Sequence, residues 1–160
     1  MKLEKLFLKW VNHTKEGSRR SSLDITDEIW KQVIKDFRNW ENSEDKEVSE
    51  HAKRLLYTGK IRRVHLDLNE VDYDNHYVSW TLVENLEDLY FFNPAYSHTI
   101  ITAEATKDNP AISFIGYLEF LKKFEGEDLV TPPIRKEKEV IFPLQEKSIL
   151  SIEKIEIKKR

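Results

Sequence analysis

Two carboxylates, Glu137 and Glu139, stand two residues apart at the start of an apolar run. On a β-strand this spacing would place both on one face, with Val140 and Phe142 on the other. Like charges side by side on a strand are unfavourable unless a partner compensates them or a reaction uses them. The simpler interpretation is a solvated charged face, which is common in a chain with 34% charged residues.

Two upstream segments favour the interpretation as a reactive site. Residues 60–68 predict a strand that carries Arg63 among aliphatic residues, and residues 77–82 predict a second strand with Ser79 and Thr81 on one face. On the other face of that second strand, we expect Trp80 to pack in the core. The order along the chain is therefore an arginine, then Ser-x-Thr, then Glu-x-Glu.

This order resembles the arginine-specific branch of the mono-ADP-ribosyltransferases, which have an arginine strand, a Ser-x-Ser or Ser-x-Thr strand and a Glu-x-Glu strand. The resemblance covers about residues 57–160 and includes the aliphatic residues after the glutamates. It implies an α+β fold in which a pair of small sheets forms an NAD cleft, here preceded by an N-terminal helical subdomain. We expect a single domain over residues 1–160, with the helical part over 1–57 and the ADP-ribosyltransferase-like core over 58–160.

The resemblance also implies roles for these residues. Arg63 would clamp the pyrophosphate of NAD, because a guanidinium binds two phosphate oxygens at once. Glu139 would stabilise the oxocarbenium-like cation that forms as nicotinamide leaves the ribose. Ser79 would hold Glu139 and that ribose, and Thr81 would support them. Glu137 would orient the acceptor and help to deprotonate it.

The arginine motif departs from the family pattern. The family has an aromatic residue before the arginine and a glycine after it, whereas Arg62 and Val64 flank Arg63 in this chain. The motif could therefore be shifted by one residue to Arg62. Thr58 stands between a tyrosine and a glycine as the family's arginine does, but a threonine cannot clamp a pyrophosphate.

Strand alternation limits the choice between the two arginines. Adjacent residues of a strand face opposite sides of the sheet, so only Arg62 or Arg63 can enter the cleft. We expect Arg63 to enter it, together with Ser79 and Glu139, while Arg62 points away.

The function implied is that of an NAD-dependent mono-ADP-ribosyltransferase. Such an enzyme releases nicotinamide and transfers ADP-ribose to a nucleophilic acceptor, here expected to be an arginine of another protein. Two alternatives remain: a non-enzymatic or degenerate protein of this fold that docks to a partner, and an NAD glycohydrolase, in which water replaces the acceptor. A small enzyme of this type would suit a phage-encoded modifier of host proteins or an intracellular toxin.

Composition excludes several other classes. The chain has no cysteine, which removes disulfides, thiolate zinc sites and a cysteine nucleophile, and its five histidines are not at metal-binding spacing, so we expect no metal. With four glycines and no glycine-rich loop, Rossmann and P-loop nucleotide sites are also excluded. The acidic residues between Asp67 and Asp74 lack the glycine and glutamate of a calcium loop, which indicates a solvated turn.

Charge and hydropathy bound the partners. A net charge of −3 argues against broad electrostatic binding of nucleic acid. No apolar segment approaches the length of a membrane span, so we expect no membrane partner and a cytoplasmic location.

Hydrophobic spacing predicts the elements that must position these residues. Helices are predicted over residues 3–11, 83–92 and 111–124. A further helix opens at Thr26 and carries Trp30, Val33, Ile34, Phe37 and Trp40 on its apolar face, and another extends from a cap at Asn42 or Ser43 to Gly59. Besides the strands already named, the predicted strands are 98–105, 139–143 and 148–157, the last with a bulge. Residues 126–135, with two prolines, predict a loop directly before the glutamates.

Overall fold

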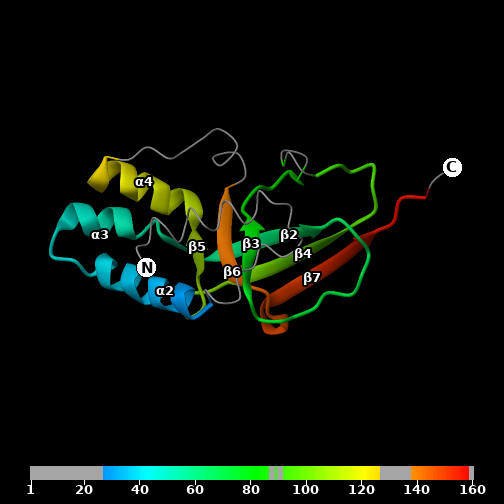
Figure 1. Ribbon diagram of the computed structural model, residues 1–160, viewed down its shortest axis with the longest axis horizontal. Coiled ribbons are helices and arrows are strands. Elements are labelled where there is room, and N and C mark those ends of the chain that lie inside the picture. The colour runs from blue at the N-terminus through cyan, green and yellow to red at the C-terminus, as the bar shows by residue number, and fades with distance from the viewer. Residues whose placement is uncertain (1–26, 87–88, 90–91, 127–137, 159–160) are drawn as a thin grey trace.

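The computed structural model describes residues 27–86, 89, 92–126 and 138–158. Three helices, α2 (Asp27–Glu41), α3 (Lys46–Ala52) and α4 (Phe114–Glu125), gather at one end of a curled antiparallel sheet (Figure 1). This arrangement confirms the predicted α+β class. The predicted helix over residues 3–11 and most of the predicted loop over 126–135 lie outside the described residues.

The sheet has seven strands in the spatial order β1-β5-β6-β3-β2-β4-β7. In chain order they are β1 (Leu56–Tyr57), β2 (Gly59–His65), β3 (Tyr77–Thr81), β4 (His98–Ala105), β5 (Ala111–Ser113), β6 (Glu139–Pro143) and β7 (Ile149–Ile155), with a short 3-10 helix, η3 (Glu146–Ser148), before β7. The described strands therefore form one sheet, where the sequence predicted a pair of small sheets.

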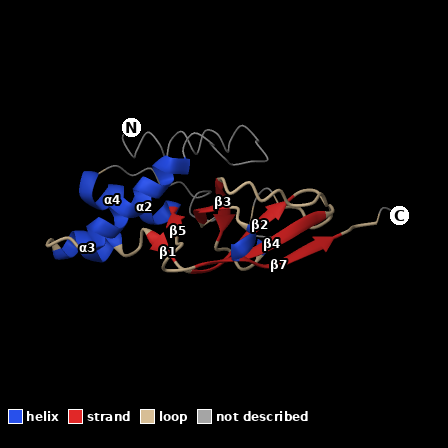
Figure 2. Ribbon diagram, turned by 90° about the horizontal axis from the view of Figure 1, so that it is seen from below, coloured by secondary structure: helices blue, strands red, loops and turns tan. Residues whose placement is uncertain are grey.

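The junction between β2 and β3 is the weakest link in this sheet. The two strands share one residue pair, Arg62 with Thr81, whereas β2 and β4 share seven. The junction thus separates a half made of β1, β5, β6 and β3 from a half made of β2, β4 and β7. In the view from below, the helices lie beside the first half and away from the second (Figure 2).

Helix α2 forms as its sequence pattern predicts. Trp30, Val33 and Phe37 recur at helical spacing and are all buried. The negative charges of Asp27 and Glu28 in the first turn interact favourably with the positive end of the helix dipole. Burial of each large side chain contributes about 1.5–3 kcal/mol, so packing of this face holds the helix against the sheet.

Helix α3 is shorter than predicted. Its N-cap is Asp45, whose carboxylate accepts hydrogen bonds from the backbone N–H groups of Glu47 and Val48, and not Asn42 or Ser43. The helix ends at Ala52 and not at Gly59, because the next residues join the sheet as β1, which pairs with β5.

Gly59 makes the bend from β1 into β2 possible. Its φ is +132°, and a Cβ at this position would lie 2.7 Å from the Tyr57 hydroxyl oxygen. Any other residue would therefore be strained and would collide with Tyr57. This bend lets one continuous stretch of chain supply a strand to each half of the sheet.

The remaining elements follow the predictions with two corrections. Strands β4 and β6 have the predicted bounds, and β7 contains the predicted bulge, since its register with β4 shifts between Thr102 and Ala103. Helix α4 begins at Phe114, because residues 111–113 form β5, which pairs with β1 and β6, and Ser113 caps the helix. Within 83–92 the described residues Leu86, Leu89 and Phe92 are linked by turn hydrogen bonds and form no α-helix.

Three apolar clusters fill the interior. The helical core joins α2, α3 and α4 to one face of the sheet and contains Trp30, Val33, Phe37, Ala52, Leu55, Tyr77, Ile112, Phe114, Tyr117, Leu118 and Ile141. The sheet core lies on the opposite face and contains Ile61, Val78, Trp80, Ile101, Ala103, Ala105, Ala111, Val140, Phe142 and Leu144. The small cluster contains Val83, Leu86 and Leu89, packed against Val64, Phe92 and Ile100.

Trp80 has the packing role that the sequence predicted. It is 2% exposed, and its ring meets Phe142 edge to face at a centroid distance of 5.9 Å. The indole N–H donates to the Phe142 carbonyl at 3.0 Å, so its polar atom is satisfied inside the core. Among the described helices, none combines the length and the apolar character needed to cross a membrane.

Candidate functional site

Three polar side chains form a row across β2, β3 and β6. Arg62 pairs with Thr81 across β2 and β3, and Thr81 pairs with Glu139 across β3 and β6. Residues directly opposite in antiparallel strands share a face, with Cβ atoms about 4.5–5.5 Å apart. Arg62, Thr81 and Glu139 therefore project side by side from one face of the sheet.

The polar row lies between two apolar clusters. On the same face of the sheet, Tyr77 and Ile141 belong to the helical core, whereas Val64 belongs to the small cluster. Charged and hydroxyl groups at such a position interrupt apolar packing, which a purely structural sheet would avoid. The row is accordingly the candidate functional site, and it combines one residue from each of the three sequence motifs.

Contacts of the row hold its side chains in place. The Arg62 Nη1 donates to the carbonyl oxygen of Glu84 at 2.7 Å. The Thr81 hydroxyl accepts from the backbone N–H of Val83 at 3.0 Å, in a turn that ends β3. Glu139 is 9% exposed, so its carboxylate lies largely out of water, where charges act more strongly on their neighbours.

Arg63 lies on the opposite face from the row. It pairs with Ile101 of the sheet core across β2 and β4, and it alternates with Arg62 along β2. The register thus places Arg62 in the row with Thr81 and Glu139, where the sequence predicted Arg63. The Arg63 guanidinium nevertheless reaches the Ser79 carbonyl and interacts electrostatically with Glu139. The pairing of β2 with β3 decides which arginine faces which side, and this pairing is a tertiary contact that residues 60–68 alone do not specify.

The Arg63 guanidinium is buried, and its hydrogen-bond acceptors include Ser79 and His65. Its Nη1 donates to the Ser79 carbonyl oxygen at 2.7 Å, and its Nε donates to His65 Nε2 at 2.9 Å. Burial lowers the pKa of Arg63 to about 10, a shift that the charges of Asp74 and Glu139 oppose. The guanidinium therefore stays charged at neutral pH, within electrostatic range of the row's carboxylate.

His65 is the neutral partner of this guanidinium. Burial first, and the charge of Arg63 second, lower the pKa of His65 to about 4, against a weaker opposite effect from Asp67. Because the Arg63 Nε always carries a proton, His65 Nε2 must be the acceptor, and its proton is on Nδ1. Sequence reasoning missed His65, although a histidine two residues after an arginine on one strand shares its face.

Ser79 offers its backbone to this guanidinium. Alternate residues of β3 bond to β6, as shown by the hydrogen bonds of the His76 carbonyl with the Leu144 N–H and of the Leu82 N–H with the Lys138 carbonyl. The Ser79 carbonyl therefore points away from β6 and toward β2. An uninterrupted ladder would pair Ser79 with Val64, but the register of the two strands contains only the Arg62 pair, and the Arg63 guanidinium takes this carbonyl instead.

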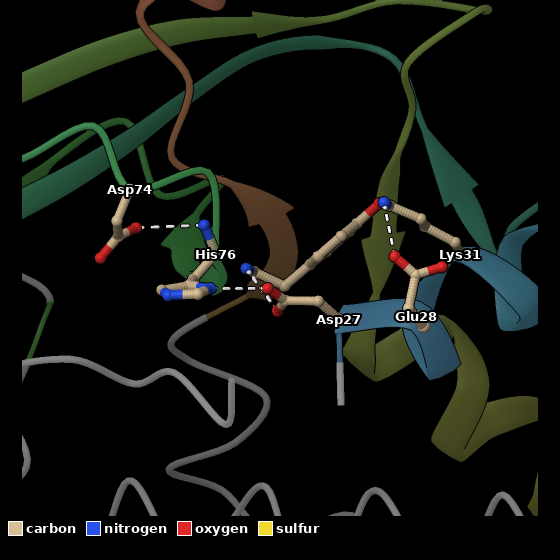
Figure 3. A network of polar contacts seen from close by, with 6 residues as sticks. Asp27, Glu28, Lys31, Asp74 and His76 are labelled. Atoms are coloured by element: carbon tan, nitrogen blue, oxygen red, sulfur yellow. Dashed lines mark hydrogen bonds and ion pairs between the residues drawn. The ribbon is translucent and has the colours of Figure 1, made fainter. Parts of the chain in front are cut away.

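A second polar network closes the other end of β3 (Figure 3). One Asp27 carboxylate oxygen accepts from the Tyr77 backbone N–H at 3.2 Å, and the other lies 2.6 Å from His76 Nδ1. The His76 backbone N–H donates to Asp74 at 3.1 Å. Burial, then Asp27 and Glu28, raise the pKa of Tyr77 to about 12. This network ties the first residue of α2 to the start of β3.

Glu137 lies outside the described residues, so its predicted role stays a prediction. The described chain resumes at Lys138, which has a φ of +45° in the left-handed region, directly before β6 begins at Glu139.

The described ranges contain no group of three His, Asp or Glu residues that could hold a metal ion. Comparison with protein-family models, with curated proteins and with solved structures found no match for this chain. The case for a function therefore depends on the residues of the site itself.

Proposed function

We propose that this protein is an NAD-dependent mono-ADP-ribosyltransferase that transfers ADP-ribose from NAD to a nucleophilic acceptor, a protein arginine, and releases nicotinamide. The observation that carries the proposal is the row of Arg62, Thr81 and Glu139 on one face of three adjacent strands. Each residue of the row comes from a different one of the three motifs, and chain order alone does not require them to meet.

Glu139 is the proposed catalytic carboxylate. Cleavage of the bond between nicotinamide and ribose sends the electron pair to the leaving nicotinamide and leaves a cation at the ribose. A carboxylate held largely out of water beside this carbon stabilises the cation more than a solvated one would. The acceptor nitrogen then forms the new bond, and Glu137 takes its proton.

Arg62 is the proposed pyrophosphate clamp, because it stands in the row with Thr81 and Glu139. Its contact with a carbonyl oxygen is one that a diphosphate could replace with a charged partner. The alternative clamp is Arg63, and NAD binding to the two alanine variants decides between them. We expect Arg62→Ala to weaken NAD binding by about 2–5 kcal/mol, the range for loss of one partner of a desolvated charge pair.

The division of the sheet at the junction of β2 and β3 supports the proposal of a mono-ADP-ribosyltransferase. A half of four strands and a half of three strands meet through one residue pair, which leaves the halves free to curl apart as a pair of small sheets would. In this proposal the site lies where the halves meet, with the helices covering the four-strand half. The acceptor protein and the cytoplasmic setting belong to the proposal as well.

Incubation of the protein with NAD labelled on the ADP-ribose part tests the proposal. Label on an added arginine-rich protein supports the transferase, and label released as free ADP-ribose would identify a glycohydrolase. Glu139→Gln should abolish both while the fold persists, because the carboxamide keeps size and hydrogen bonding but loses the charge. Glu104→Gln, an exposed strand glutamate, is the matched control and should leave activity unchanged.

Glu137→Gln tests the division of labour between the two glutamates. We expect transfer to the acceptor to be lost while hydrolysis of NAD persists, since only the acceptor needs the second carboxylate. Equal loss of both activities would instead assign Glu137 to the NAD site.

A non-enzymatic protein of this fold that docks to a partner is the second candidate. The observation that favours it is the internal use of Arg63, which binds Ser79 and His65 with 8% of its surface exposed. Absence of both transfer and hydrolysis, with no binding of NAD, would favour this candidate over the enzyme.

A further inference from the structure

The Ser79 carbonyl oxygen accepts a hydrogen bond from the Arg63 side chain, where the backbone N–H of a neighbouring strand would normally donate one. Its direction toward β2 and the single pair between β2 and β3 leave it without a ladder partner. A buried carbonyl without a partner costs about 1–3 kcal/mol, which the charged N–H of Arg63 avoids. The arginine thus lets the two halves of the sheet separate without an unsatisfied backbone group.

We propose that Arg63 and His65 are positioning residues, which act as a bracket that fixes Ser79 and keeps β2 and β3 apart at the proposed site. The Arg63 side chain donates from Nη1 to the Ser79 carbonyl and from Nε to the His65 ring, and these contacts fix the orientation of its planar guanidinium. The importance of this bracket for catalysis rests on the proposed function, whereas its effect on the fold does not.

The bracket requires a neutral His65. If His65 were protonated, its Nε2 would carry a hydrogen and could not accept from the Arg63 Nε, and two positive charges would face each other. The charged groups around the pair are Asp67, which acts on His65, and Asp74 and Glu139, which act on Arg63. At His65, burial of the imidazole and the charge of Arg63 outweigh the charge of Asp67, which keeps the pKa of His65 low.

The bracket acts on the site through the backbone of β3. Ser79 and Thr81 share the face of the polar row, and Trp80 between them is fixed in the sheet core. The Ser79 carbonyl belongs to the peptide between Ser79 and Trp80. Arg63 holds this peptide at its carbonyl and the buried Trp80 holds it from the other end, so the direction of the serine side chain is fixed. A displacement of a positioning group by about 1 Å can cost up to about 100-fold in rate, so loss of the bracket should appear in turnover.

Urea unfolding of the full chain between pH 7.5 and pH 4 tests the bracket without NAD. We compare wild type with His65→Gln, whose side-chain oxygen can accept from Arg63 at any pH, and His65→Leu, which cannot accept. The expected unfolding midpoint at pH 7.5 is close to wild type for Gln and clearly lower for Leu. Between pH 6.5 and pH 4 the midpoint of wild type should fall toward that of Leu, while the Gln variant falls less.

A histidine control and a clear contrary outcome complete this test. His51→Gln changes a half-buried histidine away from the bracket, whose ring contacts the Glu47 carbonyl and the edge of Phe124, and its difference from wild type should not depend on the state of His65. A His65→Leu variant as stable as wild type at pH 7.5 would overturn the proposal. So would a Gln variant with the same pH dependence as wild type.

Turnover of NAD separates the bracket from the proposed enzyme. At pH 7.5 we expect His65→Leu to lower kcat by about 10- to 100-fold with little change in KM, and His65→Gln to retain wild-type kcat. Equal kcat for the three proteins would overturn the positioning role. If wild type does not cleave NAD at all, the proposed function fails, and the unfolding experiment still decides whether the bracket holds the junction.

Discussion

On the side of β3 that faces β2, Tyr77 and Ser79 each contact a histidine-containing pair, and the two pairs carry opposite charge. At Tyr77 the backbone N–H meets the Asp27 carboxylate, which also lies 2.6 Å from His76. At Ser79 the backbone carbonyl meets the Arg63 guanidinium, which also binds His65. A backbone N–H on this side of β3 thus binds an anionic side chain, and a backbone carbonyl on the same side binds a cationic one.

The comparison shows how the fold assigns different roles to two histidines. Beside a carboxylate, a protonated imidazole gains an ion pair, so the contact at His76 survives and strengthens when the ring is charged. Beside a guanidinium, a protonated imidazole loses its hydrogen bond and is repelled, so His65 is kept neutral. Acid should therefore break the bracket at Ser79.

Arg63→Ala is the change expected to have the largest effect. It leaves the Ser79 carbonyl without its donor and removes the positive charge near Asp74 and Glu139, so we expect a loss of about 3–5 kcal/mol in the free energy of unfolding. Urea denaturation measures it. Arg62→Ala, which removes one hydrogen bond to a carbonyl, should cost only about 1–2 kcal/mol. A larger loss for Arg62 than for Arg63 would reverse the structural assignment of the two arginines.

The second-largest effect is expected from the protonation of His65, which should appear in the pH dependence of stability. Its folded pKa of about 4 lies below the ordinary value of 6.5, so the unfolded chain binds the proton more tightly between these values. Stability is therefore complete above about pH 6.5 and falls as the pH drops toward 4. For a partly exposed ring we expect the loss to be about 1–2 kcal/mol, measured as the difference between wild type and His65→Gln. A difference that is the same at pH 7.5 and pH 4 would contradict this linkage.

Asp27→Asn should weaken the tie at the other end of β3. The amide oxygen can still accept from the Tyr77 N–H, but the charge opposite His76 is lost, so we expect about 1 kcal/mol less stability. Hydrogen exchange of the Tyr77 amide should report the local effect, with faster exchange in the variant. Glu28→Gln, which breaks the exposed pair with Lys31 and leaves the Asp27 contacts in place, is the control and should change stability by less than about 0.5 kcal/mol.

Tyr77→Phe is expected to have the smallest effect at neutral pH, about 1 kcal/mol or less. Its effect should appear in alkali, because the folded pKa of Tyr77 is raised to about 12. The stability associated with the neutral phenol is complete below pH 10 and is lost as the pH rises toward 12. The ultraviolet titration of the folded protein should therefore lack its last phenolate step in the variant, and an unchanged titration curve would argue against burial of this ring beside Asp27.

The elements near the site could be predicted from local pattern alone. Strands β4 and β6, the core position of Trp80 and the apolar face of α2 follow from hydrophobic spacing, which is a property of neighbouring residues. The prediction failed for α3 and the start of α4, where short segments with helical spacing joined the sheet as β1 and β5. Pairing of two distant segments outweighed a weak helix preference there.

The candidate site was predicted as a set of residue types but not as a geometry. Motif order placed an arginine, a threonine and a glutamate on three strands, and these strands are neighbours in the sheet. Whether Arg62 or Arg63 joins the row depended on one pair across β2 and β3, and a shift of one residue exchanges the two faces. No property of residues 60–68 alone reports that shift.

The sequence by itself determined the α+β class, the buried strands and the residue types that can clamp an anion and stabilise a cation, because these follow from composition and local spacing. The tertiary structure alone decided that Arg62 stands in the row with Thr81 and Glu139 and that Arg63 replaces a missing ladder partner of Ser79 beside a neutral histidine. Register, burial and the desolvation of charges arise only when distant strands meet, and these set both the orientation of each arginine and the protonation of His65.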